Sequence, residues 1–359
     1  MQETITADAA RRSDAISIAR VICILGVVYV HAWTGLSGHD LEIARGTPQE
    51  SLRWLLMEIF GRSAVPLLGL ISGWLVAGSS RTQNWFRHVV RKARTILLPM
   101  VVWNGLAILF VSGAAWLLGL SAPVPVSLDW MFEEMFIVSR NPDINVQMPF
   151  LRDLFLCMIA APMLVRLPSW MLMTVAASAA FAQLMGWGPP ILMRPAILFF
   201  FTIGMVARRG GLADRVAAMS WARAALPFLL LMTAQLHFSL QATPGSGLAI
   251  GLLDLAVRVA AAACFWRLSW ALAGGPARGM LLRIEPFAFF LFCSHLILIW
   301  LGGPLLGALF GKLGSPLYPA YLLVQPLLVL IAVVLLGSML GRTWPGLAKL
   351  LSGGRLKAT

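Results

Sequence analysis

The sequence predicts an all-α fold, a polytopic bundle of about ten transmembrane helices with both termini in the cytoplasm. One observation behind this prediction is the composition. Of the 359 residues 59% are hydrophobic and 12% are charged, and the mean hydropathy is +0.82. A water-soluble domain carries about 25% charged residues. A second observation is the length of the apolar runs. They approach the roughly 20 residues that a membrane helix needs and exceed the ~10-residue strands of a membrane barrel.

Polar turns, glycines and prolines separate the expected spans. These are residues 15–33, 54–78, 95–119, 149–167, 169–188, 191–207, 221–241, 247–270, 284–303 and 319–341. The pairs that meet at Pro168 and at residues 188–190 could each be one long kinked helix, so nine or eleven spans also fit the pattern. In domain terms, residues 1–14 form a cytoplasmic N-terminal segment, 15–341 the transmembrane domain, and 342–359 a basic cytoplasmic tail.

The distribution of charge predicts the orientation. The chain has 28 Lys and Arg against 15 Asp and Glu, a net charge of +13 that in a soluble protein would suggest nucleic-acid binding. Here most basic residues fall on the side of the N-terminus, as cytoplasmic segments of membrane proteins do. We therefore expect no nucleic-acid partner and a multi-pass protein of the bacterial inner membrane. The outer connection 121–146 contains an amphipathic run, Leu128 to Val138, that we expect to form an interfacial helix.

The first span holds two ionisable residues, Arg20 and His31. Such residues inside a membrane are costly and therefore mark functional sites. Ten residues lie between them, and the step of eleven positions corresponds to roughly 16 Å along a helix. A guanidinium suits an anion such as phosphate, and a histidine suits a general base. The alternative is that Arg20 extends to the inner interface and His31 caps the outer end of its helix.

Six segments together resemble the acyltransferase-3 family of membrane acyltransferases. They are RVICILGVVYVH at 20–31, AVPLLGLISGWL at 64–75, FRHVVRKARTILLPMVVW at 86–103, PFLRDLF at 149–155, FFFTIGMVARRG at 199–210 and FFLFCSHLILI at 289–299. The resemblance implies a bundle of about ten spans that passes an acyl group, usually acetyl from acetyl-CoA, to a sugar hydroxyl. The chain is most similar to O-acetyltransferases of bacterial exopolysaccharide synthesis, of the xanthan type.

The resemblance also implies roles for the first span. His31 matches the family's first-helix histidine, taken as the catalytic base, and Arg20 matches its partner arginine on the donor side. A base is needed because a sugar hydroxyl must lose its proton when it attacks a thioester. We expect no tightly bound cofactor and no metal, because acetyl-CoA would be a substrate and the chain shows no metal-spaced histidines or cysteines.

Donor binding is expected at the segment between the second and third spans. Arg87, Arg91 and Arg94 follow a helical spacing, and an arginine face can bind the phosphates of coenzyme A. The alternative is ordinary cytoplasmic charge in contact with lipid headgroups. Ser72, with Gly73, either lets two helices pack closely or opens a channel for the pantetheine arm of the donor.

Three further residues are expected to line the site. His295 lies in the ninth span and matches the region of a late family histidine, although a hydrogen-bonded structural role is the alternative. Arg152 and Asp153 lie at the outer end of the fourth span, where they could pair with each other or contact the sugar. Acetyl and succinyl donors, either membrane face for the acceptor, and direct transfer or an acyl-histidine intermediate all fit these residues.

Rival functions remain at this point. A glycolipid or polysaccharide transporter or flippase would use intramembrane charges such as Asp254 and Arg258 to hold its cargo. A non-catalytic subunit of a polysaccharide assembly complex would bind no coenzyme A. The partners expected for the enzyme are acetyl-CoA, a sugar or lipid-linked glycan acceptor, membrane lipids and polysaccharide assembly proteins.

Overall fold

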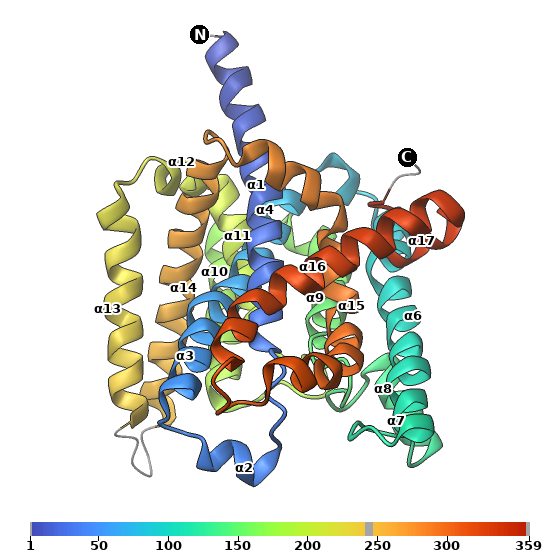
Figure 1. The fold of residues 1–359 in the computed structure, drawn as a ribbon. Coiled ribbons are helices and arrows are strands. Elements are labelled where there is room, and N and C mark those ends of the chain that lie inside the picture. Colours follow the sequence, from blue (N-terminus) through green and yellow to red (C-terminus); the bar gives the residue numbers. More distant parts are fainter. Residues whose placement is uncertain (1, 241–246, 357–359) are drawn as a thin grey trace. The chain divides into compact units, whose positions relative to one another are not determined.

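The computed structural model describes residues 2–240 and 247–356, without the side chains of residues 2–7, 62–64, 239 and 240. These residues form helices and no strands, which confirms the all-α class (Figure 1). The helices are α1 Gln2–Val30, α2 Gly38–Ile43, α3 Pro48–Leu56, η1 Met57–Gly61, α4 Arg62–Ala77, η2 Ser80–Thr82, α5 Trp85–Lys92, η3 Ala93–Leu97, α6 Leu98–Ala107, η4 Ile108–Ser112, α7 Gly113–Leu118, α8 Leu128–Phe136, α9 Pro149–Leu164, α10 Ser169–Met185, α11 Ala196–Arg209, α12 Leu212–Ala217, α13 Trp221–Leu240, α14 Gly247–Leu272, α15 Arg278–Phe310, α16 Tyr318–Thr343 and α17 Pro345–Leu351. The last residue of the expected span 221–241 and the end of the expected tail, 357–359, lie outside the described residues.

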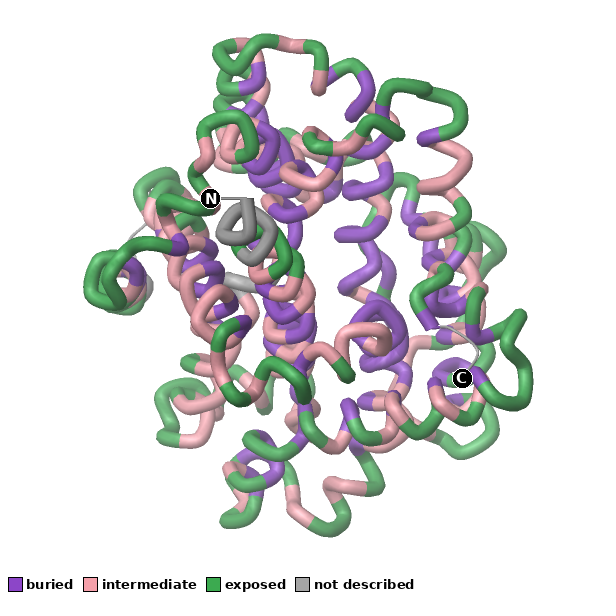
Figure 2. The backbone as a smooth tube through the Cα atoms, turned by 90° about the horizontal axis from the view of Figure 1, so that it is seen from above, coloured by how far each residue is buried: buried purple, intermediate pink, exposed green. Residues whose placement is uncertain are grey.

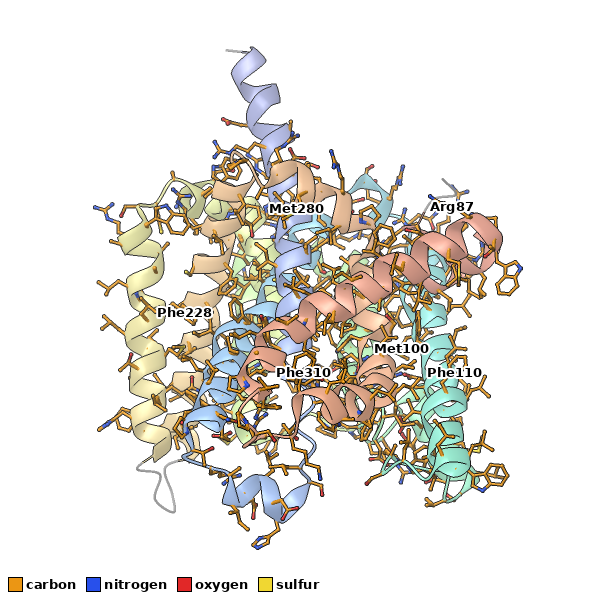
Figure 3. All side chains as sticks on the ribbon, in the orientation of Figure 1. Arg87, Met100, Phe110, Phe228, Met280 and Phe310 are labelled. Atoms are coloured by element: carbon orange, nitrogen blue, oxygen red, sulfur yellow. The ribbon has the colours of Figure 1, made fainter. Side chains whose placement is uncertain are left out.

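Helices occupy each of the ten expected spans, and among the described residues six helical stretches are long and apolar enough to cross a membrane. These are Asp8–Val30, Pro48–Ala77, Trp85–Leu118, Gly247–Leu272, Arg278–Phe310 and Tyr318–Thr343. Large apolar side chains on them stay exposed, as Phe110 does at 49% (Figure 3), which is typical of a surface that faces lipid. The structure therefore supports a multi-pass membrane protein, and the count of ten stays a prediction for the shorter helices.

The two doubtful boundaries are real breaks between helices. Pro168 is extended, with φ −64° and ψ 161°, and α10 starts at the next residue because proline suits a helix start but cannot continue the helix before it. A non-helical connection separates α10 from α11, so the alternative of two long kinked helices is wrong.

Internal contacts divide the chain into two compact units. The first unit is Met1–Cys23, Arg62–Lys92 and Asp153–Glu285, and the second is Ile24–Gly61, Ala93–Arg152 and Pro286–Thr359. Helices α1 and α15 each contribute residues to both units. Exposed residues gather in the turns between helices, and buried residues lie along the helices (Figure 2).

Close packing of α4 against α11 organises the first unit. A Cβ atom added at Gly73 would overlap the carbonyl oxygen of Phe201, and one added at Gly204 would overlap that of Leu70. Helices approach this closely only where side chains are absent, as in small-residue interfaces of membrane helices. Of the two roles expected for the Ser72–Gly73 position, the packing role is thus realised at the glycine.

The second unit packs α16 against the end of α1. Tyr318 donates its hydroxyl to the carbonyl oxygen of Trp33 at 3.1 Å, and Tyr29 donates to that of Leu323 at 3.1 Å. A buried cluster that includes Tyr321 surrounds this contact. These bonds fix the backbone on both sides of His31, which follows the last residue of α1.

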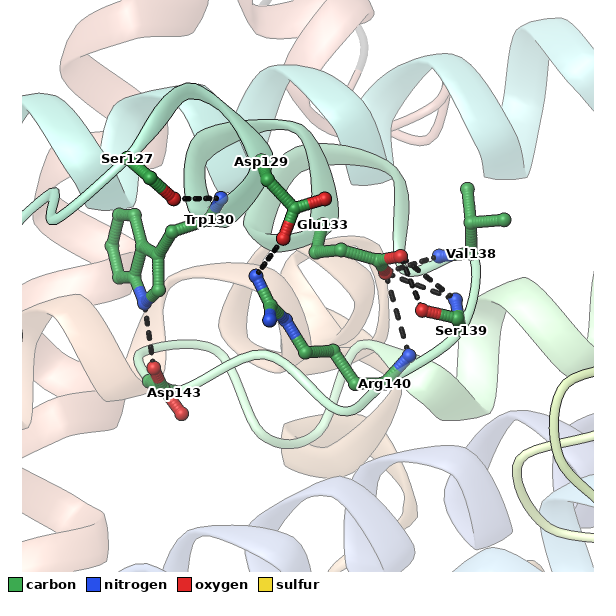
Figure 4. Close-up of polar contacts among 8 residues, drawn as sticks. All are labelled: Ser127, Asp129, Trp130, Glu133, Val138, Ser139, Arg140 and Asp143. Atoms are coloured by element: carbon green, nitrogen blue, oxygen red, sulfur yellow. Dashed lines mark hydrogen bonds and ion pairs between the residues drawn. The ribbon is translucent and has the colours of Figure 1, made fainter.

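The expected interfacial helix is present as α8. Two of its three carboxylates, those of Glu133 and Glu134, are buried, and Glu133 accepts hydrogen bonds from the backbone N–H groups of Val138, Ser139 and Arg140 (Figure 4). Several of its apolar side chains are exposed, and Leu128 is 84% exposed. A helix that exposes apolar side chains suits a position at the membrane interface, which stays a prediction.

Candidate functional site

The structure brings together two histidines that lie far apart in the sequence. His31 follows the C-terminal end of α1, and His295 lies within α15. Both belong to the second unit, and their ring centroids are 5.4 Å apart with the planes tilted by 39°. The first-span and ninth-span candidates therefore belong to one site.

Hydrogen bonding settles which nitrogen of His295 carries a proton. Its Nδ1 lies 2.9 Å from the carbonyl oxygen of Phe292 and 3.1 Å from that of Leu291. Since carbonyl oxygens only accept hydrogen bonds, Nδ1 must be the donor. In the neutral ring Nε2 then carries a lone pair. It is buried and makes no hydrogen bond with any described residue, which leaves it as an acceptor inside the protein.

A buried amide lies next to the histidine pair. Gln147 donates from Nε2 to the carbonyl oxygen of Phe292 at 3.4 Å, so it shares this carbonyl with His295. The Oε1 atom of Gln147 is buried and unpaired within the described part of the chain. Buried polar groups without a partner cost about 1–3 kcal/mol and therefore often mark functional sites. Gln147 was not among the residues predicted from the sequence, where its signal is a polar residue two positions before the PFLRDLF segment.

The position of His31 favours a positive charge on its ring. The carbonyl groups at the C-terminal end of a helix carry a partial negative charge, equivalent to about half an electron. His31 comes directly after α1 and donates its backbone N–H to the carbonyl oxygen of Val28 at 3.2 Å. A base that becomes an imidazolium during a reaction gains about 0.3–1 kcal/mol from such a position.

Arg20 has a carboxylate partner. Its Nη1 donates to Oε1 of Glu285 at 3.1 Å, and the two side chains are 37% and 25% exposed. Both residues belong to the first unit. The sequence analysis did not single out Glu285. A guanidinium has five N–H donors, so a carboxylate on one edge leaves others for an anionic group.

The basic segment is less regular than its spacing predicts. Arg87 and Arg91 lie one turn apart on α5. Arg94 lies in η3, a π-helical stretch, so the regular α-helical spacing that placed all three on one face ends at Lys92. Donor binding by these three arginines stays a prediction. Arg91 also contacts Nδ1 of His88 at 3.3 Å, and His88 is buried.

The remaining predicted residues make structural contacts. Arg152 donates to the carbonyl oxygen of Val138 at 3.2 Å. Asp153 is fully buried, and its carboxylate accepts the backbone N–H groups of Met193 and Arg194 at 3.2 and 2.7 Å. Ser72 donates its hydroxyl to the carbonyl oxygen of Leu68 at 2.8 Å. Asp153 thus holds the connection before α11, a role that its sequence position did not indicate.

Among the described residues no group of three or more His, Cys, Asp or Glu side chains could hold a metal ion. The four cysteines Cys23, Cys157, Cys264 and Cys293 are free thiols.

The fold and these residues define a class: a multi-pass, all-helical membrane protein in which the buried His295 lies beside His31. The sequence-family model described as the acyltransferase domain matches residues 13–342 of the chain. The chain therefore belongs to the acyltransferase-3 family, whose enzymes transfer acyl groups other than aminoacyl groups. It is also similar to the succinoglycan biosynthesis protein ExoH of Rhizobium meliloti (strain 1021), with 27% identity over 96% of this chain and 93% of the relative. No solved structure matches it.

Proposed function

We propose that the protein is an O-acetyltransferase of the bacterial inner membrane. It moves an acetyl group from acetyl-CoA to a sugar hydroxyl of an exopolysaccharide or its lipid-linked precursor. The observation that carries the proposal is the contact of His31 with His295, whose unpaired acceptor Nε2 is buried beside it. The similarity to a succinoglycan biosynthesis protein supports a polysaccharide acceptor.

His31 serves as the general base in this proposal. The sugar oxygen attacks the thioester carbonyl carbon while its proton passes to the imidazole, a contribution of about 10²- to 10⁴-fold in rate. The C–S bond then breaks, and the coenzyme A thiolate recovers the proton from the imidazolium. The end of α1 stabilises that imidazolium. His295 acts as a positioning residue, because its bonds to two backbone carbonyl oxygens fix the orientation of its ring next to His31.

Arginines of the cytoplasmic side bind the donor. Arg87 and Arg91 present two guanidinium groups one turn apart, a spacing that suits the diphosphate of coenzyme A. Arg20 adds a further charge-assisted contact through the donors that Glu285 leaves available. The proposal keeps the roles expected from the sequence for Arg94 and Ser72 in donor binding and for Arg152 and Asp153 in acceptor binding.

The decisive experiment replaces the base. His31→Ala should lower release of coenzyme A from acetyl-CoA, in the presence of glycan acceptor, by at least 10²-fold. His39→Ala is the matched control, because His39 is an exposed histidine of α2 in the same unit. Equal activity of His31→Ala and wild type, with both inserted in membranes, would remove His31 from the mechanism.

The acyl group needs its own measurement. Purified protein is incubated with the acceptor glycan and either acetyl-CoA or succinyl-CoA, and the mass of the glycan is measured by mass spectrometry. The proposal expects acetyl addition. If only a succinyl group is added, the assignment as an acyltransferase stands, but the donor is succinyl-CoA and not acetyl-CoA.

One observation favours the rival transport function. Arg258 and Asp254 form an ion pair of 2.7 Å on α14, within a candidate membrane span. Intramembrane charge pairs occur in substrate pathways of transporters. Glycan translocation in vesicles without coenzyme A release would decide for transport.

A further inference from the structure

The first unit contains an apolar cavity of about 180 Å³. Residues of α1, α4, α11, α12 and α14 line it, among them Trp74, Ile203, Ala263 and Trp266. The indole N–H of Trp266 donates to the carbonyl oxygen of Ala213 at 2.8 Å, so the only polar atom of this side chain already has a partner. An apolar cavity of roughly 150 Å³ stays dry and binds a small hydrocarbon. The lining therefore suits a hydrocarbon and disfavours a polar ligand.

The cavity has a basic rim at Trp74. The Cζ atom of Arg208 lies 3.9 Å from the centroid of the Trp74 ring, and that of Arg12 lies 5.9 Å away. Arg12 is neutralised by Asp214 at 2.7 Å. Arg208 forms no hydrogen bond or ion pair within the part of the chain that the structure describes, and it is exposed. A guanidinium stacked on an aromatic ring keeps its N–H donors directed along the ring plane, where they can bind a phosphate.

The cavity opens beside α12 and α14. Leu212 and Val259, from these two helices, are the lining residues that are exposed. Arg215 adds a positive charge on α12, the helix that carries Leu212, and Asp214 precedes it in the sequence. The site thus combines an apolar interior with a cationic mouth.

We propose that the cavity binds one hydrocarbon chain of an anionic phospholipid whose phosphate contacts Arg208. A phospholipid is the occupant because α14 is a candidate membrane span, so lipid chains reach the exposed Val259 at high local concentration. The unpaired charge of Arg208 selects an anionic headgroup over a zwitterionic one. This site is independent of the acyl transfer proposed above.

Tryptophan quenching tests the proposal. The purified full chain is titrated with phosphatidylglycerol or phosphatidylcholine that carries brominated chains, which quench tryptophan on contact. We expect phosphatidylglycerol to quench at about fivefold lower concentration. The chain has 14 tryptophans, so the quenching at this site is measured as the part of the total quenching that is lost in Trp74→Phe.

Matched variants locate the lipid. Ala263→Phe fills the cavity and should abolish the Trp74-dependent quenching, whereas Ala222→Phe, an exposed position on α13, should keep it. Arg208→Gln should remove the preference for phosphatidylglycerol, and Arg223→Gln, an exposed arginine of the same unit, should preserve it.

Three results would overturn the inference. They are equal quenching by both lipids in wild type, unchanged quenching in Ala263→Phe, and displacement of the brominated lipid by coenzyme A, which would assign the cavity to the donor. Should Ala263→Phe fail to elute as a folded protein, the comparison of Arg208→Gln with Arg223→Gln decides alone.

Discussion

At the scale of single residues, the backbone around His295 determines the chemistry of its side chain. Two carbonyl oxygens of its own helix hold the proton on Nδ1 and leave Nε2 as an acceptor. Side-chain amides can imitate either nitrogen. Asparagine places its NH₂ group near the Nδ1 position, and glutamine reaches the Nε2 position with an oxygen.

His295→Gln should therefore retain more activity than His295→Asn. We expect about a tenfold lower kcat for glutamine and about 10²-fold for asparagine, with the KM for acetyl-CoA unchanged in both. The pH profile of kcat should shift in both variants, because the environment of His31 changes. Equal losses in the two variants, without a shift of the profile, would indicate a packing role only.

Two variants distinguish the contribution of Arg20 to donor binding from that of its ion-pair partner Glu285. Arg20→Ala should raise the KM for acetyl-CoA about tenfold if it binds the donor, since a charge-assisted hydrogen bond contributes about 1.5–3 kcal/mol. Glu285→Gln removes the ion pair but keeps the guanidinium, so the KM should stay within about twofold. The pair itself contributes at most about 1 kcal/mol because it is partly exposed. A large rise of KM in Glu285→Gln and not in Arg20→Ala would contradict the assignment.

At the scale of elements, glycines decide how closely α4 and α11 approach. Gly73 and Gly204 each face backbone of the opposing helix, which cannot move away as a flexible side chain would. The GLISGW and FFFTIGM segments carried this information as small residues within apolar runs. The sequence could not tell which partner each glycine meets.

Gly73→Ala and Gly204→Ala should each destabilise the protein by about 1–3 kcal/mol, because the added methyl group overlaps a carbonyl. Gly279→Ala is the control, since nothing lies within 4 Å of its added Cβ. The measurement is the loss of the monodisperse elution peak after heating in detergent. Equal heat resistance of Gly73→Ala and Gly279→Ala would argue against this close packing.

The connection after α8 depends on a carboxylate. Burial tends to raise the pKa of Glu133, but hydrogen bonds from Ser139, Arg140 and Val138 outweigh it and hold the pKa below its usual value of 4.5. The lowered pKa stabilises the fold above pH 4.5, and that stability is lost as the pH falls through the folded-state pKa. In Glu134 burial dominates and raises the pKa.

Glu133→Gln should therefore weaken this connection at neutral pH by about 1–3 kcal/mol, because its NH₂ group would face backbone donors. Hydrogen exchange of the amides of residues 138–140 measures the effect. Asp129→Asn is the control, because its ion pair with Arg140 is exposed and contributes little. Unchanged protection of these amides in Glu133→Gln would remove the carboxylate from this role.

At the scale of the whole molecule, apolar run length predicted the helical class and the helix positions well. Bilayer thickness sets the length of a span, so composition and length suffice for that step. The residues of the candidate site were harder to predict, because residues that contact each other come from segments far apart in the sequence. The His31–His295 pair joins residues 264 positions apart, and the Arg20–Glu285 pair joins residues 265 apart. Gln147 and Glu285 carried no local signal beyond being polar in apolar surroundings.

The different anchoring of the two histidines has a consequence for acceptor choice. His295 lies inside a 33-residue helix that fixes its backbone on both sides, whereas His31 lies one residue past the end of α1. His295 is thus held by a continuous helix, and His31 is held by the hydrogen bonds that Tyr29 and Tyr318 make on both sides of it. A pair anchored in these two ways admits a hydroxyl group at one height only, so one position on a sugar ring should be modified in preference to its neighbours.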